Sequence, residues 1–306
     1  MAMSRDSQIK VFLQNQKKCV YQENQYLSQH TWYRIGGPAD FLVFPSNKEC
    51  LRVIVRFCNE EKIPYFILGL GANVLVSDSG FRGIVLKLTD GFREIRSKGE
   101  IIDTEAGVNL QDLILYCEKW SLSGLEYLSG IPGTIGGALI MNAGTDQAVI
   151  GDVITEVSGI TAQGDDFSIG GDEIGFAYRS APLLQDKIIL SCRLKMHRES
   201  ARKLREVRLQ QMEYRQQKQP VEYPSCGSVF MRPPGDYAGR LIERAGLKGL
   251  RRGDAMVSEK HAGFIINLGK ASAADVRFLI DEIQRIVQAE YGILLRPEVR
   301  FLGFDR

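Results

Sequence analysis

Residues 124–144 carry the composition best suited to hold a ligand against the backbone. Six of these 21 residues are glycine, and apolar residues lie between them. Glycine lets the main chain adopt positive φ and lets a ligand approach the amide groups without a Cβ in the way, which suits a pyrophosphate or a flat ring. Because this composition is not typical of a flexible Gly/Ser linker, we expect buried backbone here. The alternative is a set of tight turns between core strands.

A second glycine cluster, Gly-Leu-Gly-Ala-Asn at 69–73, lies between apolar stretches at 63–68 and 74–77 that we expect to be strands. It is not the dinucleotide fingerprint of a Rossmann fold, because no helical pattern follows the glycines. A phosphate bound here would be held by turn amides alone. Ordinary hairpin chemistry is the alternative interpretation.

Basic residues gather between 231 and 252, where six Lys or Arg stand against two acidic residues. A solvated helix face would explain most of this excess, although a minority of the side chains could meet a diphosphate. The preceding loop contains Cys226-Gly227-Ser228. A serine after a glycine in a loop is most often a turn residue.

Apolar spacing predicts the elements that position these stretches. We expect a helix after Ser46, with Glu49 completing a capping box, and another from Asn109 to about residue 120. Residues 199–219 predict a solvated helix that joins two domains, and a long amphipathic helix should run from Ser272 to Gly292. Further strands are expected at 85–88, 101–104, 153–160, 166–169 and 188–196, the first two around one polar turn. This alternation favours an α+β or α/β fold over an all-β fold.

Composition narrows the class of protein. The chain has 306 residues, enough for two or three domains, and 39 basic against 37 acidic residues, a net charge of +2. This balance argues against a general role on nucleic acid or on a membrane surface. The six cysteines are scattered without a C-x-x-C pair, so we expect reduced thiols in the cytoplasm rather than a disulfide framework or a zinc site, and no metal. The N-terminal residues lack the apolar core of a signal peptide.

Eight short motifs in order resemble one enzyme family, the FAD-dependent UDP-N-acetylenolpyruvoylglucosamine reductases (MurB). They are Arg-Ile-Gly-Gly-Pro-Ala-Asp at 34–40, Gly-Leu-Gly-Ala-Asn at 69–73, Ser-Gly-Ile-Pro-Gly-Thr-Ile-Gly-Gly at 129–137, Tyr-Arg-Ser at 178–180, Cys-Gly-Ser at 226–228, Ala-Gly-Leu-Lys-Gly at 245–249, Ser-Glu-Lys-His at 258–261 and Pro-Glu-Val at 297–299. The interval from 180 to 227 is too short for the inserted tyrosine-bearing loop of the family's first type. The chain therefore resembles the second type.

The resemblance implies an α+β, three-domain FAD-binding flavoprotein similar to the vanillyl-alcohol-oxidase/PCMH type, with a C-terminal α/β domain that covers the substrate. Residues 1–92, joined by 296–306, would form the first FAD-binding subdomain. Residues 93–200 would form the second, and residues 201–295 the substrate-binding domain. It further implies a small-molecule UDP-sugar substrate, no nucleic acid or membrane partner, and a monomer.

The implied chemistry is NADPH-dependent, FAD-mediated reduction of UDP-N-acetylglucosamine enolpyruvate to UDP-N-acetylmuramate, a peptidoglycan precursor. By motif match, Ser228 would donate the proton, and Arg179 and Glu298 would support the enolate-like charge. The residues expected to bind noncovalent FAD are Arg34, Ile35, Gly36, Gly37, Gly69, Gly71, Ala72, Asn73, Ser129, Gly130, Pro132, Gly133, Thr134, Gly136, Gly137 and Asn142. Those expected to bind substrate are Tyr178, Arg232, Lys260 and His261.

The chain departs from the family pattern at two places. Met231-Arg232-Pro233 stands where the family often has Lys-Asn-Pro, which moves a positive charge by one position. Ala72 in the 69–73 motif replaces the more common serine and so removes a hydroxyl, while the backbone amides remain.

Two other functions remain possible from the residues. One is an oxidase of the same fold that acts on a hydroxy acid or a sugar. Many such oxidases attach FAD through His or Cys, and neither residue occurs in 69–80 or 124–144. The other is a nucleotide-binding or scaffold protein that kept the fold. The preference for NADPH over NADH is likewise left open by the sequence.

Overall fold

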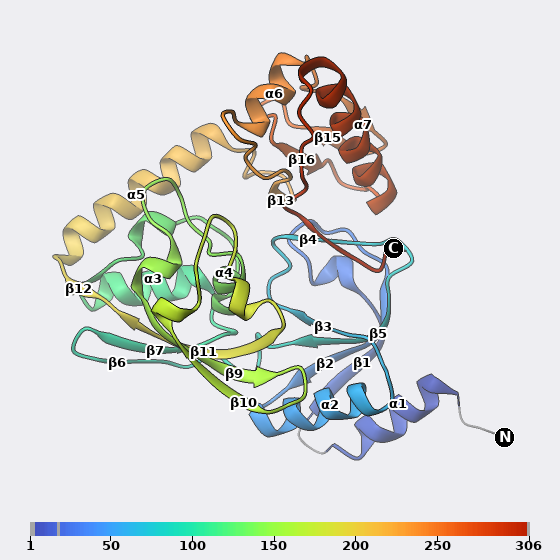
Figure 1. Ribbon diagram of the computed structural model, residues 1–306, viewed down its shortest axis with the longest axis vertical. Helices are drawn as coiled ribbons and strands as arrows, with labels where there is room; N and C mark the ends of the chain where they lie inside the picture. The colour runs from blue at the N-terminus through green and yellow to red at the C-terminus, as the bar shows by residue number, and fades with distance from the viewer. Residues whose placement is uncertain (1–3, 17–18, 305–306) are drawn as a thin grey trace. The chain divides into compact units, whose positions relative to one another are not determined.

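The computed structural model describes residues 4–16 and 19–304, which form two compact units (Figure 1). Unit 1 comprises the described residues up to Glu23, together with Asp40–Leu70 and Gly83–Glu213. Unit 2 comprises Asn24–Ala39, Gly71–Arg82 and the described residues from Tyr214 onwards. Two short segments from the first third of the chain thus belong to the same compact unit as the C-terminal third.

Unit 1 contains a five-stranded antiparallel sheet of order β10-β9-β11-β7-β6 and the larger part of a four-stranded sheet of order β1-β2-β5-β3. In the four-stranded sheet, β3 and β5 run parallel. The bounds are β1 (Cys19–Tyr26), β2 (Pro38–Pro45), β3 (Tyr65–Leu68), β5 (Phe81–Lys87), β6 (Ile95–Lys98), β7 (Ile101–Glu105), β9 (Ile154–Thr161), β10 (Asp166–Gly170) and β11 (Lys187–Lys195). A small ribbon pairs β8 (Leu122–Ser123) with β12 (His197–Arg198).

Helices bury the apolar faces of these sheets. In Figure 1, α3 and α4 lie over the five-stranded sheet, and α1 and α2 lie beside the four-stranded sheet. The helices are α1 (Arg5–Gln14), α2 (Lys48–Glu60), α3 (Leu110–Lys119), α4 (Ile135–Ile140) and α5 (Ala201–Lys218), with 3-10 turns at Leu27–Gln29, Glu126–Leu128, Ile150–Val153, Gly171–Glu173 and Pro182–Leu184. Leu113 and Ile135 share one buried cluster, and Leu51 and Ile84 share another. Burial of such side chains is the main source of stability.

Unit 2 is built on an antiparallel sheet of order β13-β16-β15-β14, against which α7 packs, and α6 packs against α7. Its elements are β4 (Val74–Val76), β13 (Ser225–Ser228), α6 (Ala238–Arg244), β14 (Arg251–Arg252), β15 (Ala255–Val257), β16 (Phe264–Asn267), α7 (Ala273–Tyr291) and β17 (Arg300–Leu302), and β4 pairs in parallel with β17. Tyr33, Ile35 and Leu75 are buried in the same core cluster as the apolar face of α7. The early segments are therefore an integral part of this core.

Several predicted elements are confirmed at their ends. Asn109 is the N-cap of α3, and α7 begins after Ser272 and ends at Gly292, whose φ is 69°. The helix expected at 199–219 is α5, in which Leu204 is buried. The capping box at Ser46 was wrong by one residue, because the side chain of Asn47 accepts the hydrogen bond from Cys50 N.

The two strands predicted on either side of one polar turn lie in different sheets. β5 belongs to the four-stranded sheet and β7 to the five-stranded sheet, and β7 pairs instead with β6 and β11. The local sequence pattern identified both strands correctly. It did not show which sheet each strand joins, because strand pairing depends on long-range packing.

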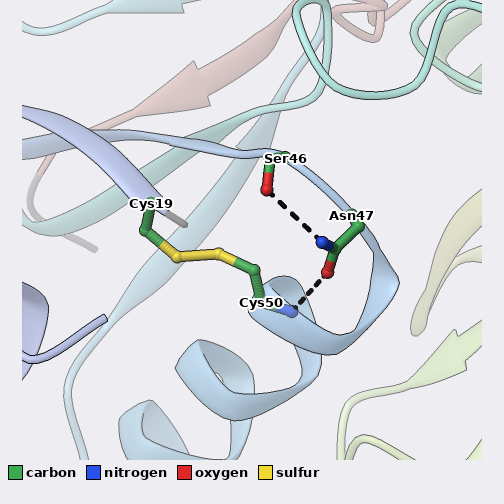
Figure 2. The surroundings of a disulfide bond; sticks show 4 residues. All are labelled: Cys19, Ser46, Asn47 and Cys50. Carbon is green, nitrogen blue, oxygen red and sulfur yellow. Dashed lines mark hydrogen bonds between the residues drawn. A yellow bond between two sulfur atoms is a disulfide. The ribbon is translucent and has the colours of Figure 1, made fainter. Parts of the chain in front are cut away.

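The expectation of six reduced cysteines is corrected by a disulfide bond between Cys19 and Cys50. Figure 2 shows that it joins the start of β1 to the first turn of α2, beside the cap formed by Asn47. The 31-residue separation carried no signal of pairing. Cys58, Cys117, Cys192 and Cys226 are free and buried.

Over the described ranges 4–16 and 19–304, no helix is both long and apolar enough to cross a membrane. In the same part of the chain, no group of three or more His, Cys, Asp or Glu residues is arranged to hold a metal ion.

Candidate active site

The glycine stretch of unit 1 forms a loop that leads into α4. Thr134 is the N-cap of this helix, and its Oγ1 accepts a hydrogen bond from Gly137 N. Gln111 of α3 holds the loop from the other side, because its Nε2 donates to Ile131 O and its Oε1 accepts from Gly130 N, both at 2.8 Å. Gln111 has the helix position expected of an ordinary polar residue, so sequence reasoning gave no reason to select it.

Most amide groups of this loop bond within the protein. Those of Ile131, Ile135 and Gly136 donate to backbone carbonyls, and those of Gly130 and Gly137 donate to the side chains of Gln111 and Thr134. Pro132 has no N–H group to offer. Among the described residues, the amide groups of Gly133 and Thr134 make no such hydrogen bond, so these are the two donors of the loop that we expect a cofactor to meet.

Gly133 marks the open side of the loop. Its φ is +155°, and a Cβ built there would meet nothing within 4 Å. Gly69 approaches the same loop, since a Cβ on it would lie 2.3 Å from Thr134 Oγ1. Bare backbone facing open space beside a helix N-terminus is the arrangement that a flavin dinucleotide can approach closely. The residues of this loop thus fit FAD.

We expect Gly133→Val to purify with little or no bound FAD, because the branched side chain would fill the space that faces the loop and because a side chain at a φ of +155° strains the backbone. Gly133→Ala adds one methyl group and should retain an intermediate amount. Flavin content per chain, measured by absorbance, checks the expectation, and circular dichroism confirms that each variant is folded. A folded Gly133→Val with full flavin content would contradict this role of the loop.

Seven of the other expected cofactor residues, those at 34–37 and 71–73, lie in unit 2, whereas Asn142 lies in unit 1. Trp32 N donates to Gly71 O at 3.2 Å, and Thr31 Oγ1 donates to Ile35 O at 3.0 Å. Gly37 N donates to Ser77 O, which fixes the turn at 34–37 next to the end of β4. The structure therefore brings the turn at 34–37 and the residues 71–73 side by side.

Two buried polar side chains anchor this turn to the sheet of unit 2. The hydroxyl of Tyr33, which is fully buried, donates to Ile265 O at 2.8 Å. Asn267 Nδ2 donates to Tyr33 O at 3.1 Å, while its Oδ1 accepts from Gly269 N and Ala271 N. Burial raises the pKa of Tyr33 well above its ordinary value, so the hydroxyl stays neutral as a donor.

Replacing Tyr33 with phenylalanine should lower stability by about 1–3 kcal/mol, because it removes a buried hydrogen bond and leaves a buried carbonyl without that donor. The exposed Tyr26 is the matched control, and Tyr26→Phe should change stability by less than about 0.5 kcal/mol. Urea unfolding of the three proteins measures the difference. Equal midpoints for Tyr33→Phe and wild type would contradict the anchoring role.

A β-bulge presents Ser228 at the end of β13. The register with β16 shifts between Ser225 and Ser228, and Gly227 at the bulge has a φ of 77°. A bulge turns the next side chain relative to the strand, and a glycine adopts positive φ without strain. Cys226 and Val229 are buried, whereas Ser228 is exposed.

Glu298 lies on the chain segment beside this bulge. Its N donates to Val229 O at 2.7 Å, and its own carbonyl accepts from Asn73 Nδ2 at 3.1 Å. Burial raises the pKa of the Cys226 thiol to about 12, and the negative charge of Glu298 adds to this rise. The structure thus brings together Ser228, Glu298 and Asn73, which are distant in sequence.

His261 lies on the same side of Gly263 as Ser228. A Cβ at Gly263 would be 3.0 Å from His261 Cε1 and 3.6 Å from Ser228 Oγ, so glycine leaves room for both. His261 Nδ1 accepts a hydrogen bond from Gly263 N at 3.1 Å. Burial lowers the pKa of His261, which favours a neutral imidazole near pH 7.

The other expected substrate residues of unit 2 are exposed. Arg232 stacks on the ring of Tyr237, with 3.9 Å from Cζ to the ring centroid. Lys260 Nζ donates to Gln216 O at 2.6 Å and lies 3.6 Å from Glu222. The amine of Lys260 is therefore engaged within unit 2.

Tyr178 and Arg179 lie in a tight turn of unit 1. Ala177 and Ser180 exchange two backbone hydrogen bonds across it, of 2.9 and 3.1 Å. Arg179 Nη1 donates to Gly144 O at 3.2 Å, at the end of the glycine stretch, and Tyr178 is exposed.

Two family models match this chain. Residues 39–169 match the FAD binding domain, and residues 219–302 match the C-terminal domain of UDP-N-acetylenolpyruvoylglucosamine reductase. The chain is 42% identical over 282 residues to UDP-N-acetylenolpyruvoylglucosamine reductase from Caldanaerobacter subterraneus subsp. tengcongensis, covering 92% of this chain and 93% of that protein.

Two solved structures are similar to this chain, one in sequence and fold and the other in fold alone. The crystal structure of UDP-N-acetylenolpyruvylglucosamine reductase (MurB) from Thermus caldophilus superposes with a TM-score of 0.80 at 35% identity, covering 93% of this chain and 99% of that one. A variant of Physcomitrella patens BBE-like 1 shares the fold alone, with a TM-score of 0.50 at 18% identity over 62% of this chain and 44% of that one. The expected fold class, an α+β flavoprotein with a C-terminal domain, is confirmed. The chain belongs to the UDP-N-acetylenolpyruvoylglucosamine reductase family.

Proposed function

We infer that this protein is a UDP-N-acetylmuramate dehydrogenase, an FAD-dependent oxidoreductase. It reduces UDP-N-acetylglucosamine enolpyruvate to UDP-N-acetylmuramate with NADPH as the reductant, and thereby contributes to peptidoglycan synthesis. The observation that carries this conclusion is similarity over more than nine-tenths of the chain to reductases of this name, through both the FAD-binding region and the C-terminal domain.

The residues divide the work of the reaction. When bound, FAD supplies the chemistry of hydride transfer from NADPH to the methylene carbon of the enolpyruvyl group. Negative charge then develops on the carbon that bears the substrate carboxylate, and this carbon takes a proton. We propose that Arg179 binds the substrate carboxylate, because its guanidinium can form two hydrogen bonds to it. Glu298 supports the enolate-like charge, and Ser228 delivers the proton from its hydroxyl.

The proximity of Ser228 and Glu298 supports this assignment. Glu298 N donates to the carbonyl of the residue that follows Ser228, so both side chains start from adjoining backbone. The residue sets expected to bind FAD and substrate remain part of the proposal, with the exception of Asn142. So does the division at 1–92 with 296–306, 93–200 and 201–295. We further propose that the enzyme acts in the cytoplasm as a monomer that binds a UDP-sugar and no nucleic acid. Light scattering at the elution peak measures the monomer directly.

Two measurements test the proposed function. Acid precipitation should release intact FAD, and NADPH oxidation should depend on UDP-N-acetylglucosamine enolpyruvate. Covalent flavin together with oxidation of a hydroxy acid by oxygen would instead identify an oxidase of the same fold. A colourless protein without NADPH oxidation would identify a binding protein that has kept the fold.

A further inference from the structure

Asn142 uses its whole side chain to join two backbone segments of unit 1. Its Oδ1 accepts from Gly151 N at 3.1 Å, and its Nδ2 donates to Ala177 O at 3.0 Å. The residue is 4% exposed. A Cβ at Gly151 would lie 2.8 Å from Asn142 Oδ1, so the two segments pack too closely there for any side chain. Through these hydrogen bonds, Asn142 links the end of α4 to the segment that carries Arg179.

The connection ends at the base of the turn that presents Arg179. The carbonyl of Ala177 accepts from Ser180 N across the turn and also from Asn142 Nδ2. Arg179 has a φ of 52°. This backbone conformation is unfavourable for any residue other than glycine, and it persists only where the surrounding structure holds it in place. The Arg179 guanidinium bonds Gly144 O, two residues after Asn142. The turn and the guanidinium are thus held by the same short segment, 142–144.

We propose that Asn142 is a positioning residue for Arg179 rather than a ligand of the cofactor. By fixing the carbonyl of Ala177 it sets the turn at 177–180, and so the direction from which the guanidinium meets the substrate carboxylate. This inference rests on the proposed function, in which Arg179 binds that carboxylate. The competing explanation is a helix cap alone, because Asn142 follows α4 with a φ of 41°, where asparagine is common.

Two substitutions separate these explanations. Asn142→Gly keeps the positive φ without strain and removes both side-chain hydrogen bonds. Asn142→Asp keeps the shape and the acceptor for Gly151 N, but places a carboxylate oxygen against the carbonyl of Ala177. Both variants should bind FAD fully and be reduced by NADPH within about twofold of the normal rate. Reoxidation by the enolpyruvyl substrate should fall by about 10- to 100-fold, the size of effect that misplacing a binding group by about 1 Å can have.

A double-mutant cycle shows whether the effect passes through Arg179. In an Arg179→Ala background, Asn142→Gly should slow reoxidation by less than about twofold, because the group that it positions is gone. An equal loss in both backgrounds would overturn the proposal. Loss of FAD from either single variant would overturn it as well, by showing a role toward the cofactor.

Asn47→Ala is the matched control. It removes another asparagine side chain that bonds a backbone amide, at the N-cap of α2. It should lower thermal stability and leave reoxidation within about twofold of wild type. Failure of the proposed function itself would appear differently, as wild-type enzyme that the substrate does not reoxidise. With wild type active and Arg179→Ala slow, a normal rate for Asn142→Gly would overturn the positioning role alone.

Discussion

Replacing Ser228 with alanine is expected to slow reoxidation of the reduced flavin by the enolpyruvyl substrate by about 10²–10⁴-fold, the usual contribution of a general acid. The variant should bind FAD and be reduced by NADPH at nearly the normal rate, because the change removes only the proton donor. Stopped-flow absorbance of the flavin follows the two half-reactions separately. A Ser228→Ala enzyme that is reoxidised at the wild-type rate would contradict the assignment.

The surroundings of Ser228 bear on how a serine can act as an acid. A hydroxyl is a poor acid in water, so its site must stabilise the alkoxide or return a proton to it. Ser228 is exposed at the bulge of β13, next to the segment of Glu298 and on the side of Gly263 where His261 lies. Ser228→Cys, with a stronger acid of similar shape, should recover part of the rate that Ser228→Ala loses. A cysteine variant as slow as the alanine variant would show that the hydroxyl acts in another way.

Replacing Arg179 with lysine should slow reoxidation by about 10²-fold, comparable to the loss of one donor that stabilises developing charge. Lysine keeps the positive charge but lacks the fixed fork of donors that binds a carboxylate at two points. Reduction of the flavin by NADPH should remain nearly normal, since it involves no substrate carboxylate. Separate measurement of the two half-reactions checks this difference.

A surface arginine of the same unit provides the control for Arg179. Arg193 on β11 pairs with Asp103 and Glu156 and is about half exposed. Arg193→Lys should leave both half-reactions unchanged, because such surface pairs contribute little. If Arg179→Lys slowed both half-reactions equally, its role would be structural.

The local sequence pattern predicted individual helices and strands better than it predicted which of them contact one another. Asn109, Ser272 and Gly292 were identified as helix ends because capping depends on the neighbouring residues alone. The disulfide between Cys19 and Cys50 was missed for the opposite reason, since it depends on where β1 starts relative to α2. For the same reason, the sequence did not show that the strands near 85 and 101 belong to different sheets.

In the candidate site, too, the sequence predicted local features but not the contacts between residues distant in sequence. The glycines of 129–137 predicted buried backbone that a ligand could approach closely, but only the structure shows that Gln111 bonds part of this backbone and that Gly133 faces open space. No sequence pattern singled out Tyr33, yet its hydroxyl donates a hydrogen bond to Ile265 O in β16, more than 200 residues away. No local pattern could place Glu298 beside the residue after Ser228. The expectation that Glu298 and Ser228 act in the same reaction came from the resemblance to the family.

An anaerobic experiment shows whether the reduced flavin passes its hydride to the enolpyruvyl substrate. The enzyme is reduced with one equivalent of NADPH and then mixed with UDP-N-acetylglucosamine enolpyruvate in the absence of oxygen. We expect the absorbance of oxidised flavin to return, with one equivalent of UDP-N-acetylmuramate formed for each flavin. A flavin that stays reduced in the presence of this substrate, and is reoxidised only when oxygen is admitted, would contradict the account.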